Sequence, residues 1–212
     1  MARTAPPSAN PSSKSSCAAS LDVTHPHRGS APGHPDGVAR AVRVLVDAFA
    51  PIGWPDDLDD ARNEVQESLA PGRVSLIARD ESGAVLGWVG GLHEYARVWE
   101  LHPLAVAPAA QRRGVGRALV AALEERVAAL GGLTLRLGTD DMHIVETGEG
   151  RTSLAGVDLY PDPLKHLSAI RNLRGHPYEF YLACGYAIVG VMPDANGIGQ
   201  PDIFMSKRIA QE

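Results

Sequence analysis

The stretch that decides the fold of this chain runs Leu104-Ala-Val-Ala-Pro-Ala-Ala-Gln-Arg-Arg-Gly-Val-Gly-Arg-Ala-Leu119. Its pattern predicts a strand that ends near Val106, a short loop, and a long helix that Gly114 and Gly116 open. Glycines at that point let backbone N–H groups approach a ligand, and the unpaired N–H groups of a helix N-terminus bind phosphate. A strand-to-helix turn that merely needs flexible residues is the alternative interpretation.

Two other phosphate-binding loops do not fit this stretch. A dinucleotide-binding fold requires a third glycine near position 119, which is leucine here, and it places its loop after the first strand of the domain. A Walker-type loop requires Gly-Lys followed by Ser or Thr, and this stretch lacks that sequence.

Outward from this stretch, hydrophobic periodicity and turn residues predict alternating helices and strands. Asp80-Glu81-Ser82-Gly83 is typical of a hairpin turn between two of the strands. Paired strands followed by a strand–helix–strand unit imply a mixed, mostly antiparallel sheet flanked by helices, in the α/β (α+β) class. The predicted helices span residues 38–49, 56–69, 114–130, 164–173 and 177–183, and the predicted strands span residues 74–78, 84–92, 98–106, 133–137, 187–192 and 203–208.

Residues 1–36 differ in composition from everything that follows them. Ser, Pro and Ala dominate this segment, and few of its side chains offer apolar surface to bury. Such a composition predicts a disordered tail, and it lacks the apolar core of a secretory signal. We therefore expect one folded domain over residues 37–212.

Composition and charge exclude several classes of protein. The 212 residues are 44% hydrophobic and 21% charged, which is ordinary for one globular domain. No run approaches the roughly 18 consecutive apolar residues of a membrane-spanning helix, and a net charge of -5 argues against a nucleic-acid partner. Cys17 and Cys184 cannot form a disulfide framework, and no Cys/His cluster has zinc spacing, so no metal is expected.

The hexapeptide Gln111-Arg-Arg-Gly-Val-Gly116 resembles the pyrophosphate-binding signature Gln/Arg-x-x-Gly-x-Gly/Ala of the GCN5-related N-acetyltransferases. The resemblance implies that family's fold, with acetyl-CoA as the cosubstrate. It also implies that the loop amides hold the pyrophosphate and that the preceding strand pairs with the pantetheine arm. The cofactor-binding residues implied in this way are Leu104, Ala105, Val106, Gln111, Arg112, Arg113, Gly114, Val115, Gly116, Arg117 and Ala118.

Longer stretches between Trp99 and Arg208 resemble one subgroup, the aminoglycoside 6′-N-acetyltransferases of the enterococcal chromosomal type. The subgroup implies a cytoplasmic homodimer that acetylates the 6′-amino group of aminoglycosides. The matching stretches are Trp99-Glu-Leu-His-Pro-Leu104, Leu137-Gly-Thr-Asp-Asp141, Asp158-Leu-Tyr160, Asn172-Leu-Arg174, His176-Pro-Tyr-Glu-Phe-Tyr181, Gly185-Tyr186, Val189-Gly-Val191, Asp194-Ala-Asn-Gly197 and Pro201-Asp-Ile203.

One segment departs from the subgroup. Residues Met142 to Arg151 form an insertion beside the expected acceptor site. The departure leaves the reaction as expected but leaves the substrate preference open. A polyamine or a protein lysine is the alternative acceptor, and a non-catalytic acyl-CoA-binding regulator is the alternative class.

Tyr181 is the candidate proton donor for the departing thiolate. The resemblance places the matching tyrosine beside the coenzyme sulfur, and a phenol with a pKa of about 10 can protonate a thiolate. Without the resemblance, the sequence favours the interpretation that Tyr178, Phe180, Tyr181 and Tyr186 are all core aromatics.

Three residues of the predicted strand 98–106 are further catalytic candidates. Glu100 and His102 lie two positions apart and so share a face of the strand, where a buried pair is unusual unless it lines a cleft. Glu100 could hold the incoming ammonium or take its proton, with His102 close by; a structural Glu–His pair is the alternative. The resemblance further implies that the backbone N–H of Leu104 polarises the thioester carbonyl.

Acidic residues crowd the segment from Asp140 to Asp162, which holds six of them against one arginine. Aminoglycosides are polycations, so carboxylates near the acetyl group would attract and orient them. Asp140 and Asp141 directly follow a strand end, and together with Asp158 and Glu100 they are the predicted substrate-binding residues. Solvated surface is the alternative interpretation of the acidic segment.

Overall fold

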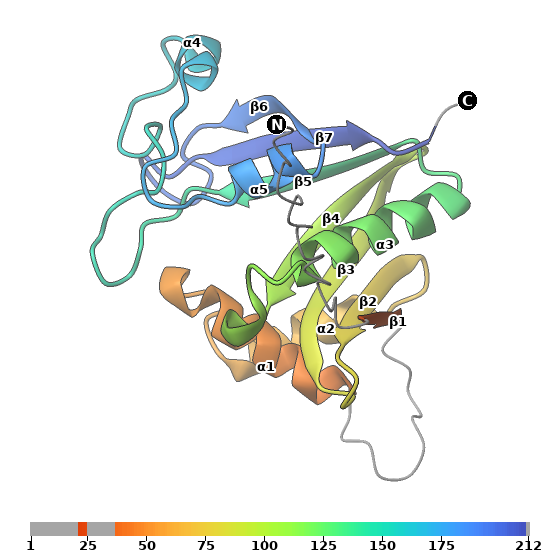
Figure 1. Cartoon of the computed structure of the whole chain (residues 1–212). Coiled ribbons are helices and arrows are strands. Elements are labelled where there is room, and N and C mark those ends of the chain that lie inside the picture. Colours follow the sequence, from red (N-terminus) through yellow and green to blue (C-terminus); the bar gives the residue numbers. More distant parts are fainter. Residues whose placement is uncertain (1–20, 25–36, 211–212) are drawn as a thin grey trace, which may run out of the picture.

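The computed structural model of the chain describes residues 21–24 and 37–210. Helices and strands alternate along most of this length (Figure 1). In chain order the elements are β1 (Asp22–Thr24), α1 (Gly37–Phe49), η1 (Ala50–Ile52), α2 (Leu58–Glu67), β2 (Arg73–Arg79), β3 (Val85–Tyr95), β4 (Val98–Val106), η2 (Pro108–Ala110), α3 (Val115–Ala129), β5 (Thr134–Asp140), α4 (Pro163–Ser168), α5 (Tyr178–Ala183), β6 (Ala187–Met192) and β7 (Asp202–Arg208).

The seven strands form one sheet in the order β1-β2-β3-β4-β5-β7-β6. Every neighbouring pair is antiparallel except β4 and β5, which run parallel and are joined through α3. A parallel pair needs such a crossover, because a short turn cannot return the chain to the same end of the sheet. The predicted mixed, mostly antiparallel sheet flanked by helices is therefore confirmed.

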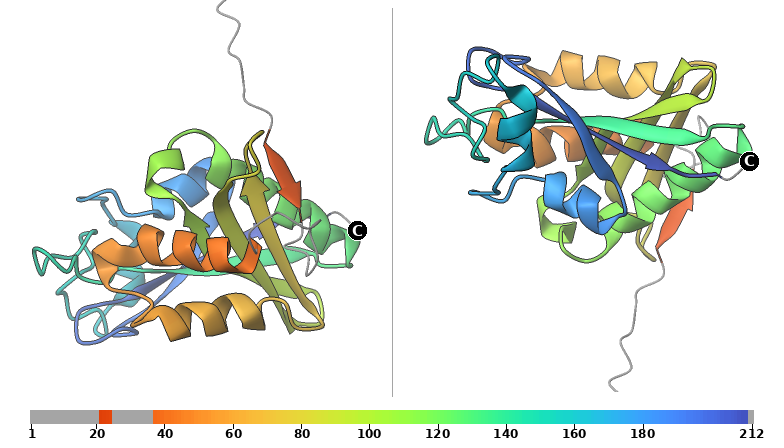
Figure 2. Two further views of the ribbon diagram at one scale, coloured as in Figure 1. Left: turned by 90° about the horizontal axis from the view of Figure 1, so that it is seen from below. Right: turned by 90° about the horizontal axis from the view of Figure 1, so that it is seen from above.

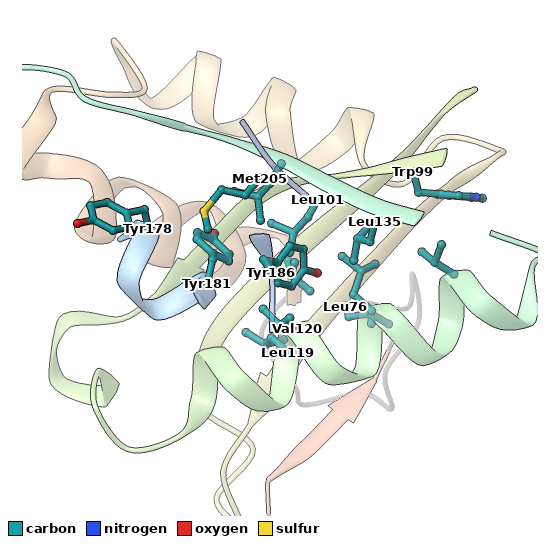
Figure 3. Packing of buried hydrophobic residues seen from close by; sticks show 14 of the residues in the cluster. Leu76, Trp99, Leu101, Leu119, Val120, Leu135, Tyr178, Tyr181, Tyr186 and Met205 are labelled. Carbon is teal, nitrogen blue, oxygen red and sulfur yellow. The ribbon is translucent and has the colours of Figure 1, made fainter. Parts of the chain in front are cut away.

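The helices cover opposite faces of the sheet (Figure 2). Helices α1 and α2 bury Leu45 and Val65 against Ile77 and Trp88 on one face. Helix α3 has apolar side chains at three- and four-residue spacing, so one stripe of it faces the other side of the sheet. That stripe and α5 enclose the larger cluster, in which Leu119, Val120, Tyr181, Tyr186, Leu101 and Met205 pack together (Figure 3).

The sheet opens between β4 and β5. These strands are in register only at Val98/Thr134, Trp99/Leu135 and Glu100/Arg136. Beyond those pairs β4 stays with β3 as far as Val106, and β5 stays with β7 as far as Asp140. The two halves of the sheet diverge from there (Figure 1), and the edge of β4 that faces β5 is left without a strand partner.

The structure differs from the sequence prediction at two segments. Residues 22–24 form β1 and pair with β2, so the segment 1–36 is not uniformly unstructured; its other residues, apart from Leu21, lie outside the described part. A strand of three residues is too short for its periodicity to be recognised in a sequence. The predicted helix 164–173 also ends early, at Ser168, because Asn172 instead bridges to Thr152.

Across the described ranges 21–24 and 37–210, no helix combines the length and apolarity needed to cross a membrane.

Candidate functional site

A cleft of about 1040 Å³ lies where β4 and β5 diverge. Its size suits a large ligand or two smaller ones, since ligand sites typically enclose about 300–1,000 Å³. Its lining comes from α2 and the α1–α2 connection, from the free edge of β4, and from the loop before α3 with the start of that helix. The end of β5 with the segment after it, α5 with the residues before it, and the β6–β7 connection complete it. The lining includes Pro51, Ile52, Trp54, Glu64, His102, Leu104, Val106, Gln111, Arg112, Gly114, Gly116, Arg117, Gly138, Asp140, Met142, Arg151, Phe180, Tyr181 and Asn196.

Residues 112–117 form a cradle of backbone N–H groups at one end of the cleft. Among the hydrogen bonds within the described ranges, none uses an N–H group of residues 112–117 as its donor. Gly114 has a φ of 87°, which favours glycine, and Arg112 reaches the same left-handed region with a φ of 58°. This turn and the N-terminus of α3 together present several free donors, which is the requirement for binding phosphate.

Gly116 provides space in the cleft, whereas Gly114 is favoured by its positive φ. A Cβ atom at Gly116 would lie 3.3 Å from the ring of Phe180 and 3.6 Å from the side chain of Val106. A side chain there would press on the wall where β4 and α5 face each other, so glycine keeps the cleft open.

The other predicted cofactor residues fall into two groups. Leu104, Val106, Gln111 and Arg117 line the cleft beside the glycines. Four others are not among the described residues that line the cleft: Ala105 and Val115 are buried in the core, Ala118 is half-buried, and Arg113 lies near Asp80, whose pKa it helps to lower. The predicted contacts are made by the backbone of the strand and the loop, and they stay a prediction at all of these positions.

The alternative interpretation of Glu100 and His102, a structural Glu–His pair on β4, is wrong. Glu100 pairs instead with Arg136 on β5 (3.2 Å), and it is not among the described residues that line the cleft. Arg136 also binds Glu94, and this hydrogen-bonded ion pair lowers the pKa of the Glu94 carboxyl. His102 does line the cleft, with its Nε2 3.6 Å from Glu64 Oε1 and its ring 5.9 Å from that of Trp54.

A bulge between β3 and β4 helps to set the orientation of the His102 side chain. The register of β3 and β4 shifts between Val89 and Gly91, and the carbonyl of His102 approaches so close that a Cβ atom at Gly90 would collide with it. Bulges reorient individual side chains along a strand. The glycine in β3 thus helps to turn His102 toward α2.

Tyr181 lies on α5 and lines the cleft. Its ring packs edge-on against Phe180 (centroids 5.1 Å apart) and Tyr186 (5.8 Å), and the residue is 7% exposed. Burial raises the pKa of the Tyr181 phenol above its ordinary value, because a phenolate would lose its hydration. The side chain therefore combines a core position with a neutral hydroxyl beside the cleft.

His176 connects the start of α5 to the end of β5. Its Nδ1 accepts a hydrogen bond from the Tyr178 N–H (3.2 Å), so the proton resides on Nε2, which donates to the carbonyl of Asp140 (3.1 Å). Burial lowers the pKa of His176 to about 4, so the ring is neutral at physiological pH. Asn172 reinforces the link by bonding both the N–H and the carbonyl of His176 (2.8 Å each).

Of the six acids between residues 140 and 162, Asp140 alone lines the cleft, where it accepts a hydrogen bond from Asn196 Nδ2 (2.5 Å). The prediction that Asp141 contacts substrate is wrong. Asp141 is 0% exposed, and its carboxylate accepts bonds from Arg151 N (2.6 Å) and from Thr152 N (3.0 Å) and Oγ1 (2.6 Å). Asp158 is exposed and caps a turn at Tyr160 N (3.2 Å), apart from the described lining of the cleft.

Comparisons with known proteins agree with this geometry. A model of the acetyltransferase (GNAT) family matches residues 39–143. The crystal structure of an aminoglycoside 6′-N-acetyltransferase complexed with coenzyme A is 35% identical, covering 90% of this chain and 98% of that one, with a TM-score of 0.76. This chain belongs to the GNAT acetyltransferase family. The resemblance seen in the glycine loop is thereby confirmed.

Two further solved structures are similar to this GNAT chain. The aminoglycoside 6′-N-acetyltransferase from Enterococcus faecium is 36% identical over 90% of this chain and 98% of that one, with a TM-score of 0.74. An aminoglycoside 6′-acetyltransferase type Ii is 31% identical over 90% and 99%, with a TM-score of 0.62. A sequence comparison with curated proteins finds no significant match.

Several cleft residues of this GNAT domain were not predicted from the sequence. Glu64 and Trp54 come from the α1–α2 region, and Glu64 has the same local pattern as the exposed acids Asp59 and Glu67 of the same helix. Only the packing of α2 against the sheet sets it apart.

Asp202 is a further unpredicted group, and it lies opposite Asp140 in the β5–β7 register. Burial and the charge of Asp140 raise its pKa to about 7, although the backbone N–H of Thr139 and the guanidinium of Arg136 favour its ionised form. Its side chain lies over Gly138, where a Cβ atom would collide with the carboxylate. Asp202 therefore forms part of the electrostatic surroundings of Asp140.

Proposed function

We propose that this chain transfers the acetyl group of acetyl-CoA to the 6′-amino group of aminoglycosides. The observation that carries the proposal is one continuous cleft with two unlike ends. The cradle end is made of free N–H groups, and the acidic end is made of Glu64, His102, Asp140 and Asn196. Similarity of 35–36% identity over 90% of the chain to two aminoglycoside 6′-N-acetyltransferases supports this acceptor.

The residues present fit coenzyme A. The unused N–H groups of residues 112–117 would hold its pyrophosphate, and Arg112 and Arg117 would add positive charge beside it. The free edge of β4 at residues 104–106 would bind the amide-containing pantetheine arm, since an unpaired strand edge offers donors and acceptors in a row. When bound, acetyl-CoA supplies an acyl group activated as a thioester.

The acidic end would bind the acceptor and take its proton. Glu64 and Asp140 provide negative charge for an ammonium group, and Glu100 adds to that field from its position beside Arg136. His102 is 47% exposed at its side chain and faces Glu64, so it can accept the proton that the ammonium must lose before its nitrogen attacks. Glu64 would favour the imidazolium that forms.

Leu104 and Tyr181 would act between the two ends. The backbone N–H of Leu104 would donate a hydrogen bond to the carbonyl oxygen as negative charge develops there. As the carbon–sulfur bond breaks, the Tyr181 hydroxyl would donate its proton toward the departing sulfur. Because burial disfavours the Tyr181 phenolate, this hydroxyl stays protonated and available throughout the neutral pH range.

A polyamine or a protein lysine is the second candidate acceptor. One observation favours it: the acidic end holds fewer carboxylates than the sequence indicated, because Asp141 and Asp158 lie elsewhere. A smaller charge suits an amine with fewer ammonium groups. A non-catalytic acyl-CoA-binding regulator would have no need of a cleft that contains both His102 and Tyr181.

A thiol-release assay tests the proposal. Free coenzyme A is measured with kanamycin-type aminoglycosides, spermidine and lysine peptides as acceptors, and the acetylated nitrogen is located by NMR. We expect turnover with aminoglycosides at the 6′-amine and at least tenfold lower kcat/KM for the other amines. Faster turnover of spermidine or peptides would assign the second candidate, and no thiol release with any amine would support the regulator.

The resemblance also leads us to propose a cytoplasmic homodimer. Light scattering coupled to size-exclusion chromatography would give twice the chain mass, and a monomer at micromolar concentration would contradict this.

A further inference from the structure

Residues 142–151, the insertion that departs from the resembled subgroup, form an ordered strap at the acidic end of the cleft. The chain leaves β5 at Asp140, runs out as a loop, and returns to Arg151 (Figure 1). At its base the buried carboxylate of Asp141 accepts the N–H groups of Arg151 (2.6 Å) and Thr152 (3.0 Å). One side chain thereby joins both ends of the strap.

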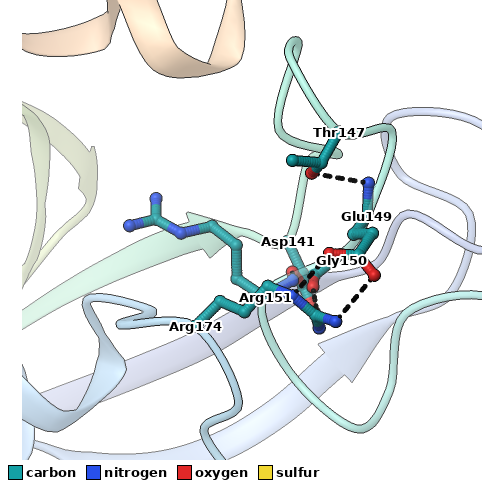
Figure 4. Close-up of polar contacts among 6 residues, drawn as sticks. All are labelled: Asp141, Thr147, Glu149, Gly150, Arg151 and Arg174. Atoms are coloured by element: carbon teal, nitrogen blue, oxygen red, sulfur yellow. Dashed lines mark hydrogen bonds and ion pairs between the residues drawn. The ribbon is translucent and has the colours of Figure 1, made fainter.

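A second set of bonds holds the strap to its own side of the cleft (Figure 4). Glu149 forms an ion pair with Arg174 (2.8 Å), which also donates to the carbonyl of Gly150 (3.2 Å). The Arg151 guanidinium donates to the carbonyl of Gly175 (2.9 Å), and His143 N–H donates to Gln200 Oε1 (3.0 Å). The strap is therefore fixed to the segment that leads into α5 and to the β6–β7 connection.

The tip of the strap reaches the opposite wall. Val145 N–H donates to the carbonyl of Pro51 in η1 (3.0 Å), and a Cβ atom at Gly53 would lie 3.2 Å from Val145 Cγ2. Pro51 and Ile52 line the cleft from the α1–α2 side, and Met142 and Arg151 line it from the strap side. The strap thus connects two walls that the divergence of β4 and β5 would otherwise leave apart.

We propose that the strap is a specificity element that closes this end of the cleft and limits the size of the acceptor amine. Its contribution to the cleft is Met142, an apolar side chain, and Arg151, a cation that repels further ammonium groups. An acceptor therefore places the ring that bears its reacting amine inside the cleft. Its remaining rings must project out of the cleft on the side away from η1. The inference rests on the proposed function only in taking the acidic end as the place where the acceptor binds.

The test shortens the strap without disturbing its base. Ile144 N–H already donates to the Glu149 carbonyl (2.9 Å), so a Gly-Gly connection can replace residues 145–148 as a two-residue turn. Asp141, Arg151 and the Glu149–Arg174 pair stay in place. Val145→Ala is the matched control, because it keeps the backbone N–H that bonds Pro51 and removes only part of the packing on Gly53.

The readout is the ratio of kcat/KM values for neomycin, with four rings, and neamine, with two rings, which share the reacting ring. We expect the shortened variant to raise this ratio at least tenfold, while Val145→Ala changes it less than threefold. The KM for acetyl-CoA should stay within twofold, because the cradle lies at the other end. A ratio unchanged in a shortened variant that melts like the wild type would overturn the proposal.

Failure of the proposed function would be seen separately, in the wild type. If neither aminoglycoside reacts or binds by calorimetry, the same comparison is made with lysine peptides of three and ten residues. A shortened strap that leaves the preference between those peptides unchanged also overturns the size limit. A gain for the longer peptide would support the size limit while the aminoglycoside assignment fails.

Discussion

The two ends of the cleft are built in different ways. The cradle end is main chain: six consecutive residues present N–H groups, and Gly114 and Gly116 are there for conformation and space. The acidic end is side chains from separate elements, with Glu64 on α2, His102 on β4, Asp140 on β5 and Asn196 before β7. A main-chain site can be recognised in one short stretch of sequence, whereas a side-chain site exists only after folding.

The largest expected effect lies at the junction of the two ends. Tyr181→Phe keeps the ring that packs on Phe180 and Tyr186 and removes the proton, so kcat should fall about 10²–10⁴-fold. Single-turnover measurement avoids masking by slow product release. An unchanged rate would return Tyr181 to a purely structural role, and acetyl-CoA affinity serves as the control because the cradle is untouched.

His176 links the start of α5 to the end of β5, and its ionisation should change the stability of the fold. Its pKa is about 4 in the fold and about 6.5 in the unfolded chain, so the unfolded chain binds more protons between these values. Its contribution is fully present above pH 6.5 and is lost as pH falls toward 4, by up to about 3 kcal/mol.

The measurement is the free energy of unfolding against pH for the wild type and His176→Gln, which keeps a donor for the Asp140 carbonyl. The comparison is needed because Asp202 acts oppositely: its pKa is raised to about 7, so its contribution is present at low pH and lost as pH rises toward 7. Parallel curves for the two proteins would show that His176 does not titrate in this window.

A negative charge at the cradle end should weaken the binding of acetyl-CoA and leave the binding of the acceptor unchanged. Gly114→Asp places a carboxylate where pyrophosphate would bind, and Gly114→Asn is its neutral match, since both side chains tolerate a positive φ. We expect acetyl-CoA to bind on the order of 10- to 50-fold more weakly to the Asp variant than to the Asn variant by calorimetry. Equal affinities would mean that phosphate binds elsewhere.

The smallest expected effect distinguishes the roles of Asp140 and Asp141. Asp140→Asn should raise KM for kanamycin by about 2- to 30-fold and leave acetyl-CoA affinity unchanged, with added salt reducing the difference. Asp141→Asn should instead lower stability by about 1–3 kcal/mol, because it weakens three hydrogen bonds at the base of the strap. A rise in KM of the same size in both variants would contradict this division.

Sequence reasoning succeeded where the information is local. Strand 98–106 and strand 187–192 were predicted with the bounds that the structure shows, because apolar runs and turn residues mark both ends. The glycine loop was found because its function depends on backbone conformation, which glycine reports directly. Helix 114–130 differs from α3 by one residue at each end.

Sequence reasoning failed where the side chains that contact a residue come from distant parts of the chain. Glu100 and His102 were expected to face one site because they share a face of a strand, but Glu100 pairs with Arg136 and only His102 is among the described residues that line the cleft, beside Glu64. Asp141 looks the same as Asp140 in sequence, yet hydrogen bonds from Arg151 and Thr152 hold its side chain in the interior, while Asp140 lines the cleft. No local pattern encodes which neighbour will arrive from another element.

The base of the strap is closed by hydrogen bonds, and this has a consequence for how its length can change. Because Asp141 and the Ile144–Glu149 hydrogen bond already bring the two arms together, the chain between them can change length with little effect on the rest of the fold. Each doubling of such a loop costs only about 0.6 kcal/mol in closure entropy. Insertions and deletions at the four tip positions 145–148 therefore change the shape of the acidic end of the cleft, while the residues of β4, α3 and α5 that line the rest of it stay in place.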